Sequence, residues 1–159
     1  MLLIGLGLAV AALAPASAPA KTGGTDRPVK GTAVGIVTVT LPGLHVSVDA
    51  SGVLSHLGRY TGHFEGDAQI VQAGIVGGGI FTLAAANGDQ LTGTFTLAEP
   101  PFTGAAHPVD TTLTIGGGSG RFGDASGTIA LPLVATPISL GGGLLVEAAE
   151  GPMKGLISY

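Results

Sequence analysis

From residue 31 onward, apolar side chains alternate with polar ones, and this period of two restricts the possible folds more than any other feature of the chain. In residues 109–115, VDTTLTI, the valine, leucine and isoleucine occupy odd positions. About eight to ten short runs of this kind are separated by turn residues, and none has the spacing of an amphipathic helix. The sequence predicts an all-β fold, a single antiparallel β-barrel of about eight strands, with a β-sandwich as the alternative. The barrel is preferred because closure removes exposed strand edges.

The clearest hairpin lies in residues 79–99, GIFTLAAANGDQLTGTFTLAE. Asn87-Gly88 between two alternating runs predicts a two-residue type I′ turn, because both central residues of that turn need positive φ. The inner face predicted by this register comprises Ile80, Ala84, Leu91, Phe95 and Leu97. The same register turns Phe81 and Leu83 outward, and exposed apolar positions of this kind predict self-association as a dimer or trimer.

The N-terminal residues indicate export. Residues 1–20 have the layout of a secretory signal peptide, in which an uncharged apolar run is followed by an A-x-A cleavage site at Ala18 and Ala20. Residues 21–30, KTGGTDRPVK, are expected to form a flexible polar leader, and residues 31–159 the barrel domain. The sequence therefore predicts a secreted protein, extracellular or periplasmic, with no membrane segment after signal removal.

The charge balance argues against a nucleic-acid partner. The formal net charge is −4, and the six lysines and arginines are scattered along the chain. Such a chain lacks the basic patch that binds nucleic acid or an anionic membrane. The sequence holds no cysteine, which excludes disulfides and thiolate metal sites. We expect no cofactor and no metal; the expected partners are a small apolar molecule and further copies of the chain.

Residues 116–127, GGGSGRFGDASG, contain a G-x-G-x-x-G spacing that starts at Gly118. A dinucleotide-binding loop needs this spacing to lead from a strand into a helix, because the pyrophosphate lies on the helix N-terminal amides. Here a β-branched segment with two prolines follows instead. The stretch therefore predicts a turn with a bulge, in which Gly117, Gly118 and Gly120 allow positive φ and Phe122 anchors the loop in the core.

The same stretch carries a family resemblance. Residues 117–122, GGSGRF, followed by Ala125 and Gly127, resemble the G-G-T-G-x-F-x-x-A-x-G hairpin of plant dirigent proteins, and are similar to the related segment of allene oxide cyclases. With residues 56–62 and 85–91, the stretch also resembles a group of uncharacterised secreted bacterial proteins. The resemblance implies an eight-stranded antiparallel barrel, often trimeric, with an apolar cavity. No catalytic residue of either plant family lies in the matched stretch, so none is carried over.

A strand expected over residues 53–65, VLSHLGRYTGHFE, holds the densest group of polar side chains and follows a predicted turn at 49–52. Alternation places His56 and Tyr60 on the inner, apolar face and Arg59 on the outer face. His56 and Tyr60, with Arg59 beside them, are the candidate ligand-binding residues. The alternative is that His56 and Tyr60 are core side chains hydrogen-bonded to the backbone. We identify no catalytic residue and no metal ligand set.

The remaining histidines and acids are given no functional role. His45 and His107 are isolated in the sequence and are interpreted as incidental. His63 and Glu65 are expected to belong to an exposed cross-strand charge cluster, which contributes little to stability. Glu147 lies near a turn, where solvated carboxylates are common.

Two functions follow as hypotheses. The first is a secreted, non-enzymatic binding or structural module that holds a small apolar ligand in the barrel. The second is a cyclase- or dirigent-like enzyme that guides a reactive apolar intermediate by restricting its conformation. A filled core would favour a structural module, whereas a wide barrel with His56, Tyr60 or an acid pointing inward would favour an enzyme.

Overall fold

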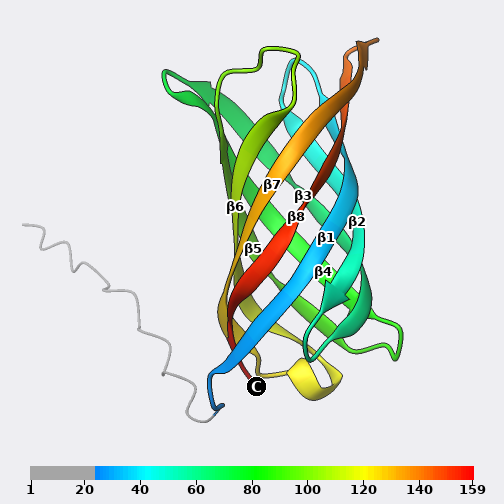
Figure 1. The fold of residues 1–159 in the computed structure, drawn as a ribbon, viewed down its shortest axis with the longest axis vertical. Coiled ribbons are helices and arrows are strands. Elements are labelled where there is room, and N and C mark those ends of the chain that lie inside the picture. The colour runs from blue at the N-terminus through cyan, green and yellow to red at the C-terminus, as the bar shows by residue number, and fades with distance from the viewer. Residues whose placement is uncertain (1–23) are drawn as a thin grey trace, which may run out of the picture.

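The computed structural model describes residues 24–159, which form one closed barrel of eight antiparallel strands and a short 3-10 helix, η1 (Figure 1). This architecture confirms the predicted all-β fold with a single barrel of about eight strands. The strands are β1 (Arg27–Thr40), β2 (His45–Leu54), β3 (Gly58–Val71), β4 (Gly74–Ala85), β5 (Gln90–Glu99), β6 (His107–Ser119), β7 (Ser126–Gly141) and β8 (Leu144–Ser158). Each strand pairs with its neighbours in sequence, and β8 closes the barrel against β1. Among the described residues, no helix is long and apolar enough to cross a membrane.

The barrel has two unlike ends (Figure 1). One, which we call the closed end, carries the start of β1, the C-terminus and the β2–β3, β4–β5 and β6–β7 connections. The β6–β7 connection contains η1 (Gly120–Phe122). The other, the open end, carries the β1–β2, β3–β4, β5–β6 and β7–β8 connections.

Apolar side chains fill the half of the barrel nearest the closed end. The largest of those less than 2% exposed are Val29, Leu54, Leu83, Leu91, Leu113, Phe122, Ile129, Met153 and Ile157. Tyr60 is buried among them, and its hydroxyl donates a hydrogen bond to the Thr32 carbonyl oxygen at 3.1 Å. Burial raises the pKa of Tyr60 to about 12. Tyr60 is therefore a neutral core tyrosine bonded to the backbone, the alternative role considered for it.

The glycine-rich stretch forms a turn with a bulge. The register between β5 and β6 shifts so that Gly116 has no partner, and η1 then begins at Gly120, where φ is 62°. A Cβ on Gly120 would lie 1.9 Å from Oδ1 of Asp89, so a larger residue would displace that loop. Phe122 is completely buried, and its ring packs edge-on against Tyr159 with centroids 4.8 Å apart. These features match the turn, bulge and aromatic anchor expected from the sequence. Gly117 and Gly118, predicted as turn residues, instead pair with β5 inside β6, and Gly118 does not take a positive φ.

The loop of the β4–β5 hairpin is one residue longer than predicted. The Ala85 N–H donates to the Asp89 carbonyl oxygen, with N and O 2.9 Å apart, so residues 86–88 form the loop. Gly88 takes φ of 90° in this loop, and Asn87 accepts from the Asp89 N–H through its side-chain oxygen. The predicted two-residue turn is therefore wrong, although its two residues do lie in the loop.

One additional loop residue turns the side chains of β4 to the opposite face of the sheet. Phe81 and Leu83 are 3% and 0% exposed, so their predicted outward orientation is wrong. Ile80, predicted to face inward, is 65% exposed. Leu91 and Phe95 on β5 face the core as expected. Phe81 and Leu83 are therefore buried in the barrel, and they no longer support the predicted self-association.

β2 continues through residues 49–52, where a turn was predicted, because it pairs with β1 along its whole length. The chain reverses at residues 55–57 instead. There the Ser55 hydroxyl donates to the Lys30 carbonyl oxygen at 3.0 Å and accepts from the Lys30 N–H at 2.7 Å. His56, at the centre of the reversal, has φ of 70°. Cross-strand pairing here outweighs the local turn tendency of Asp, Ser and Gly.

β1 begins at Arg27, inside the segment predicted as a flexible leader over 21–30. Its first residue pairs with Ile157 of β8, so residues 27–30 belong to the barrel. The predicted domain start at residue 31 is therefore four residues late. The predicted signal peptide, 1–20, lies outside the described residues.

Candidate functional site

The half of the barrel nearest the open end is hollow. It encloses a cavity of about 270 Å³ that reaches from the open-end connections down to Phe64 and Phe95. These two rings form its floor, with centroids 5.6 Å apart in an edge-on arrangement. Three lining residues are polar, Glu99, Thr111 and Glu147, and every other one is apolar or glycine. The wall is therefore suited to an apolar molecule with a single polar group.

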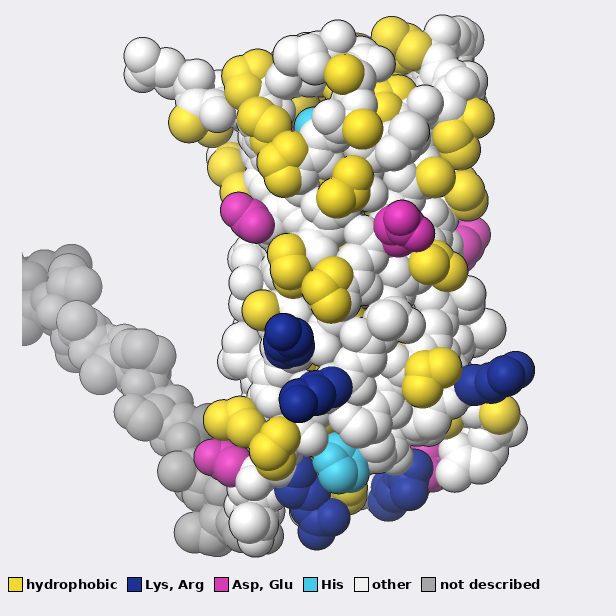
Figure 2. Space-filling view, viewed as in Figure 1, with side chains coloured by type: hydrophobic (Ala, Val, Ile, Leu, Met, Phe, Trp, Pro, Cys, Tyr) yellow, Lys and Arg dark blue, Asp and Glu magenta, His cyan; other side chains and the backbone are white. Residues whose placement is uncertain are grey.

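Apolar side chains also surround the mouth of the cavity, and Figure 2 shows them gathered at the open end. The large exposed ones there are Leu41, Ile70, Phe102, Ile138, Leu140 and Leu144, between 36% and 75% exposed. Phe102 lies in the β5–β6 connection, lines the cavity and packs edge-on against the His107 ring with centroids 6.0 Å apart. An apolar molecule entering the barrel would therefore meet apolar surface first.

Three ionisable side chains meet beside the cavity, and two of them, Glu99 and Glu147, line it. Glu99 ends β5, His107 begins β6, and Glu147 lies on β8. Nε2 of His107 is 3.3 Å from Oε2 of Glu99 and 3.8 Å from Oε1 of Glu147. The side chains of His107 and Glu147 are 6% and 5% exposed, and that of Glu99 is 15% exposed. We call these three residues the carboxylate–histidine cluster.

The hydrogen-bond partners of His107 determine which of its ring nitrogens faces the two carboxylates and titrates beside them. Nδ1 lies 3.0 Å from the carbonyl oxygen of Ala105, which can only accept, so Nδ1 carries a proton. Nε2 is then the atom that gains or loses a proton next to Glu99 and Glu147. The cluster can therefore accept or donate a proton at the cavity wall.

Burial raises the pKa of Glu147, and the nearby Glu99 carboxylate adds to the rise, while His107 opposes it. Burial also raises the pKa of Glu99, again opposed by His107. Burial disfavours the charged form of His107, but the hydrogen bond to Ala105 and the two carboxylates outweigh it, so the pKa of His107 is raised. All three groups therefore hold protons more tightly in the folded protein than in the unfolded chain.

This arrangement predicts that stability falls as pH rises. A raised pKa means that the folded state binds more protons than the unfolded state between the two pKa values, so the free energy of unfolding decreases across that interval. The intervals begin at the ordinary glutamate and histidine values, about 4.3 and about 6.5. We expect the wild-type protein to be more stable at about pH 5 than at about pH 8. Urea unfolding followed by circular dichroism measures the difference.

Glu147→Gln should stabilise the protein at about pH 8 by about 1 to 2 kcal/mol, because it removes a buried charge of which one oxygen, Oε1, has no hydrogen-bond partner. At about pH 5 the same substitution should have a smaller effect, since the wild-type carboxyl is then closer to protonation. Glu150→Gln is the matched control, because Glu150 is exposed on the same strand. Equal effects of both substitutions at both pH values would contradict this prediction.

The residues predicted to bind a ligand lie elsewhere. Tyr60 is in the filled half, and Arg59 is exposed on the outer face. His56 lies at the β2–β3 reversal, where its Nε2 is 3.1 Å from the Pro28 carbonyl oxygen. The prediction that His56 shares the inner face with Tyr60 is wrong, because the chain reverses between Leu54 and Gly58 and His56 lies in that reversal. None of the three lines the cavity.

Glu99, His107 and Glu147 were missed by the sequence analysis, although a signal for them exists. Glu99 continues the alternation of Leu91, Gly93, Phe95 and Leu97. His107 precedes Val109 by two residues, and Glu147 precedes Ala149 by two. An ionisable residue in phase with the apolar face of a strand is predicted to point inward. The interpretation of His107 as isolated and of Glu147 as a solvated turn residue is therefore wrong.

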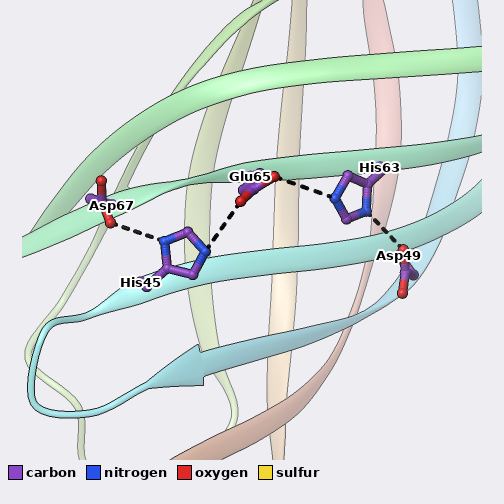
Figure 3. Close-up of polar contacts among 5 residues, drawn as sticks. All are labelled: His45, Asp49, His63, Glu65 and Asp67. Atoms are coloured by element: carbon purple, nitrogen blue, oxygen red, sulfur yellow. Dashed lines mark hydrogen bonds and ion pairs between the residues drawn. The ribbon is translucent and has the colours of Figure 1, made fainter.

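A second group of ionisable side chains lies on the outer face of β2 and β3 (Figure 3). Acids and histidines alternate in it, in the order Asp67, His45, Glu65, His63 and Asp49, with contacts of 3.0, 3.5, 3.8 and 2.9 Å. These side chains are 46% to 86% exposed, so their ion pairs contribute little to stability. Within residues 24–159, no three histidines or acids converge as a metal site requires.

Comparisons of the chain with protein-family models, with curated proteins and with solved structures find no match. The cavity and the carboxylate–histidine cluster are therefore the features that bear on function.

Proposed function

We propose that the protein is a secreted binding module that holds one small, largely apolar molecule in the hollow half of the barrel. The observation that carries this proposal is the apolar cavity of about 270 Å³ with a buried polar cluster on its wall. Binding sites for small molecules commonly combine an apolar lining with a few polar groups that fix orientation. The apolar body of the ligand would contact the valines, leucines and alanines of the wall, and its polar atom would face the cluster.

The contrast between the two halves supports binding over a purely structural role. The filled half is packed as protein interiors are, whereas the hollow half leaves apolar side chains without neighbours on one side. Such a void lowers stability relative to a filled barrel, because its lining lacks dispersion contacts. A bound apolar molecule restores those contacts.

The test is binding of N-phenyl-1-naphthylamine, a neutral apolar dye that fluoresces when it leaves water. We expect saturable binding to the wild type with one dye per chain. Ala68→Phe should abolish it, because Ala68 lines the cavity. Ala98→Phe is the control, since Ala98 is exposed on the outer face of β5 and should leave binding unchanged. Absence of binding, or equal binding by wild type and Ala68→Phe, would overturn the proposal.

A cyclase- or dirigent-like enzyme is the second candidate, and the inward-facing acids favour it. Glu99 and Glu147 both line the cavity next to His107, which provides a proton donor and acceptor beside a bound apolar molecule. Native mass spectrometry of the protein purified from its own secretion separates the two candidates. The same retained molecule in wild type and Glu147→Gln supports binding alone, whereas a different molecule in the variant supports turnover.

A further inference from the structure

One oxygen of the carboxylate–histidine cluster has no hydrogen-bond partner. Among the described residues, Oε1 of Glu147 is the buried side-chain oxygen or nitrogen that no donor reaches. Nε2 of His107 is 3.8 Å from this oxygen and lies closer to Glu99, at 3.3 Å. A buried acceptor left without a donor is costly, and more so when it is charged. Because Glu147 and Glu99 both line the cavity, a donor on a ligand can approach the carboxylates of this cluster from the cavity side.

The charges around the cavity indicate which kind of donor fits. Two carboxylates share one histidine, so the cluster carries an excess negative charge when all three groups are ionised. Within residues 24–159, no lysine or arginine lines the cavity. The five in this part of the chain lie towards the closed end, and Figure 2 shows lysine and arginine side chains on the outer surface of that half. They are Arg27, Lys30, Arg59, Arg121 and Lys154.

We propose that the ligand is an apolar amine, whose protonated nitrogen donates to Glu147 beside Glu99 while its hydrocarbon part fills the cavity. This inference rests on the proposed function. An ammonium group supplies both the missing donor and the missing positive charge. A carboxylate at the same place would add a third negative charge to a buried site with one histidine, so fatty acids are disfavoured. A neutral alcohol supplies the donor without the charge and is expected to bind between these extremes.

Three probes with the same hydrocarbon chain separate these cases: octylamine, octanol and octanoate. Displacement of N-phenyl-1-naphthylamine at about pH 7 measures their affinities, and the amine is protonated there as lysine is. We expect octylamine to bind at least about tenfold more tightly than octanol, and octanoate to bind most weakly. Glu147→Gln should lower the affinity for octylamine about tenfold and leave octanol within about twofold. Glu150→Gln should leave all three affinities unchanged.

Equal affinities for octylamine and octanol, or tighter binding of octanoate, would overturn this inference while leaving apolar binding intact. An unchanged preference for octylamine in both Glu147→Gln and Glu99→Gln would overturn it as well, because the preference would then come from another part of the molecule. Failure of the dye and of all three probes would overturn the proposed function itself. The two failures are therefore distinguishable.

Discussion

Phe122→Ala is expected to lower the free energy of unfolding by about 3 to 5 kcal/mol, the range for removing a fully buried phenylalanine side chain. Phe122 is 0% exposed, and its ring closes the filled half of the barrel against Tyr159. Domains of this size are commonly stable by about 5 to 15 kcal/mol, so the loss is a large share of the total. Urea unfolding followed by far-ultraviolet circular dichroism measures it.

Phe102→Ala is the matched control for this substitution. Phe102 is 36% exposed at the mouth of the hollow half, so its truncation removes fewer contacts. We expect a loss of about 1 kcal/mol or less. Equal losses for Phe122→Ala and Phe102→Ala would show that the closed end does not hold the main stabilising core.

Gly127→Ala is the second substitution with a large expected effect, about 2 to 4 kcal/mol of destabilisation. Gly127 on β7 has φ of 146°, a conformation that side chains rarely adopt. A Cβ there would also lie 2.1 Å from the Leu156 carbonyl oxygen of β8, so the two strands would have to separate. Thermal unfolding of the variant should show the loss as a lower midpoint temperature.

Gly141→Ala tests whether the effect is specific to that position. Gly141 ends the same strand, and a Cβ built on it would meet no atom within 4 Å. Alanine at such a site is expected to be neutral or to stabilise by about 0.4 to 1 kcal/mol, because it restricts the unfolded chain. A loss of stability in Gly141→Ala as large as in Gly127→Ala would mean that β7 tolerates no side chain at either glycine.

The fold class was predictable because alternation is a property of each strand by itself. In VDTTLTI the inward residues Val109, Leu113 and Ile115 are identified without knowledge of any partner strand, and all three are buried. Turn positions were less predictable. The segment at 49–52 has the composition of a turn, yet its pairing with β1 keeps it extended. The Asn-Gly pair marks the correct loop but not its length, and one residue of error reversed the faces of β4.

The candidate site was predicted least well, because it depends on residues distant in sequence. Glu99 and His107 flank one connection, but Glu147 lies on β8, two strands from β6, and only the curvature of the barrel brings it to the other two. That each of these residues points inward could be read from the alternation along its strand, but the cavity that they adjoin could not be predicted from the sequence. His56, by contrast, was a candidate ligand-binding residue only on the assumption that residues 53–65 form one unbroken strand.

The position of the termini has a practical consequence. Asp26 and Ser158 lie side by side at the closed end, where the Ser158 hydroxyl donates to Oδ1 of Asp26 at 2.6 Å. Any polypeptide or surface joined to the chain before Asp26 or after Tyr159 is therefore attached at the pole opposite the cavity mouth. A barrel immobilised or fused just before Asp26 or after Tyr159 would present its mouth to the surrounding solution, so both of these positions suit a sensor or display scaffold built on this fold.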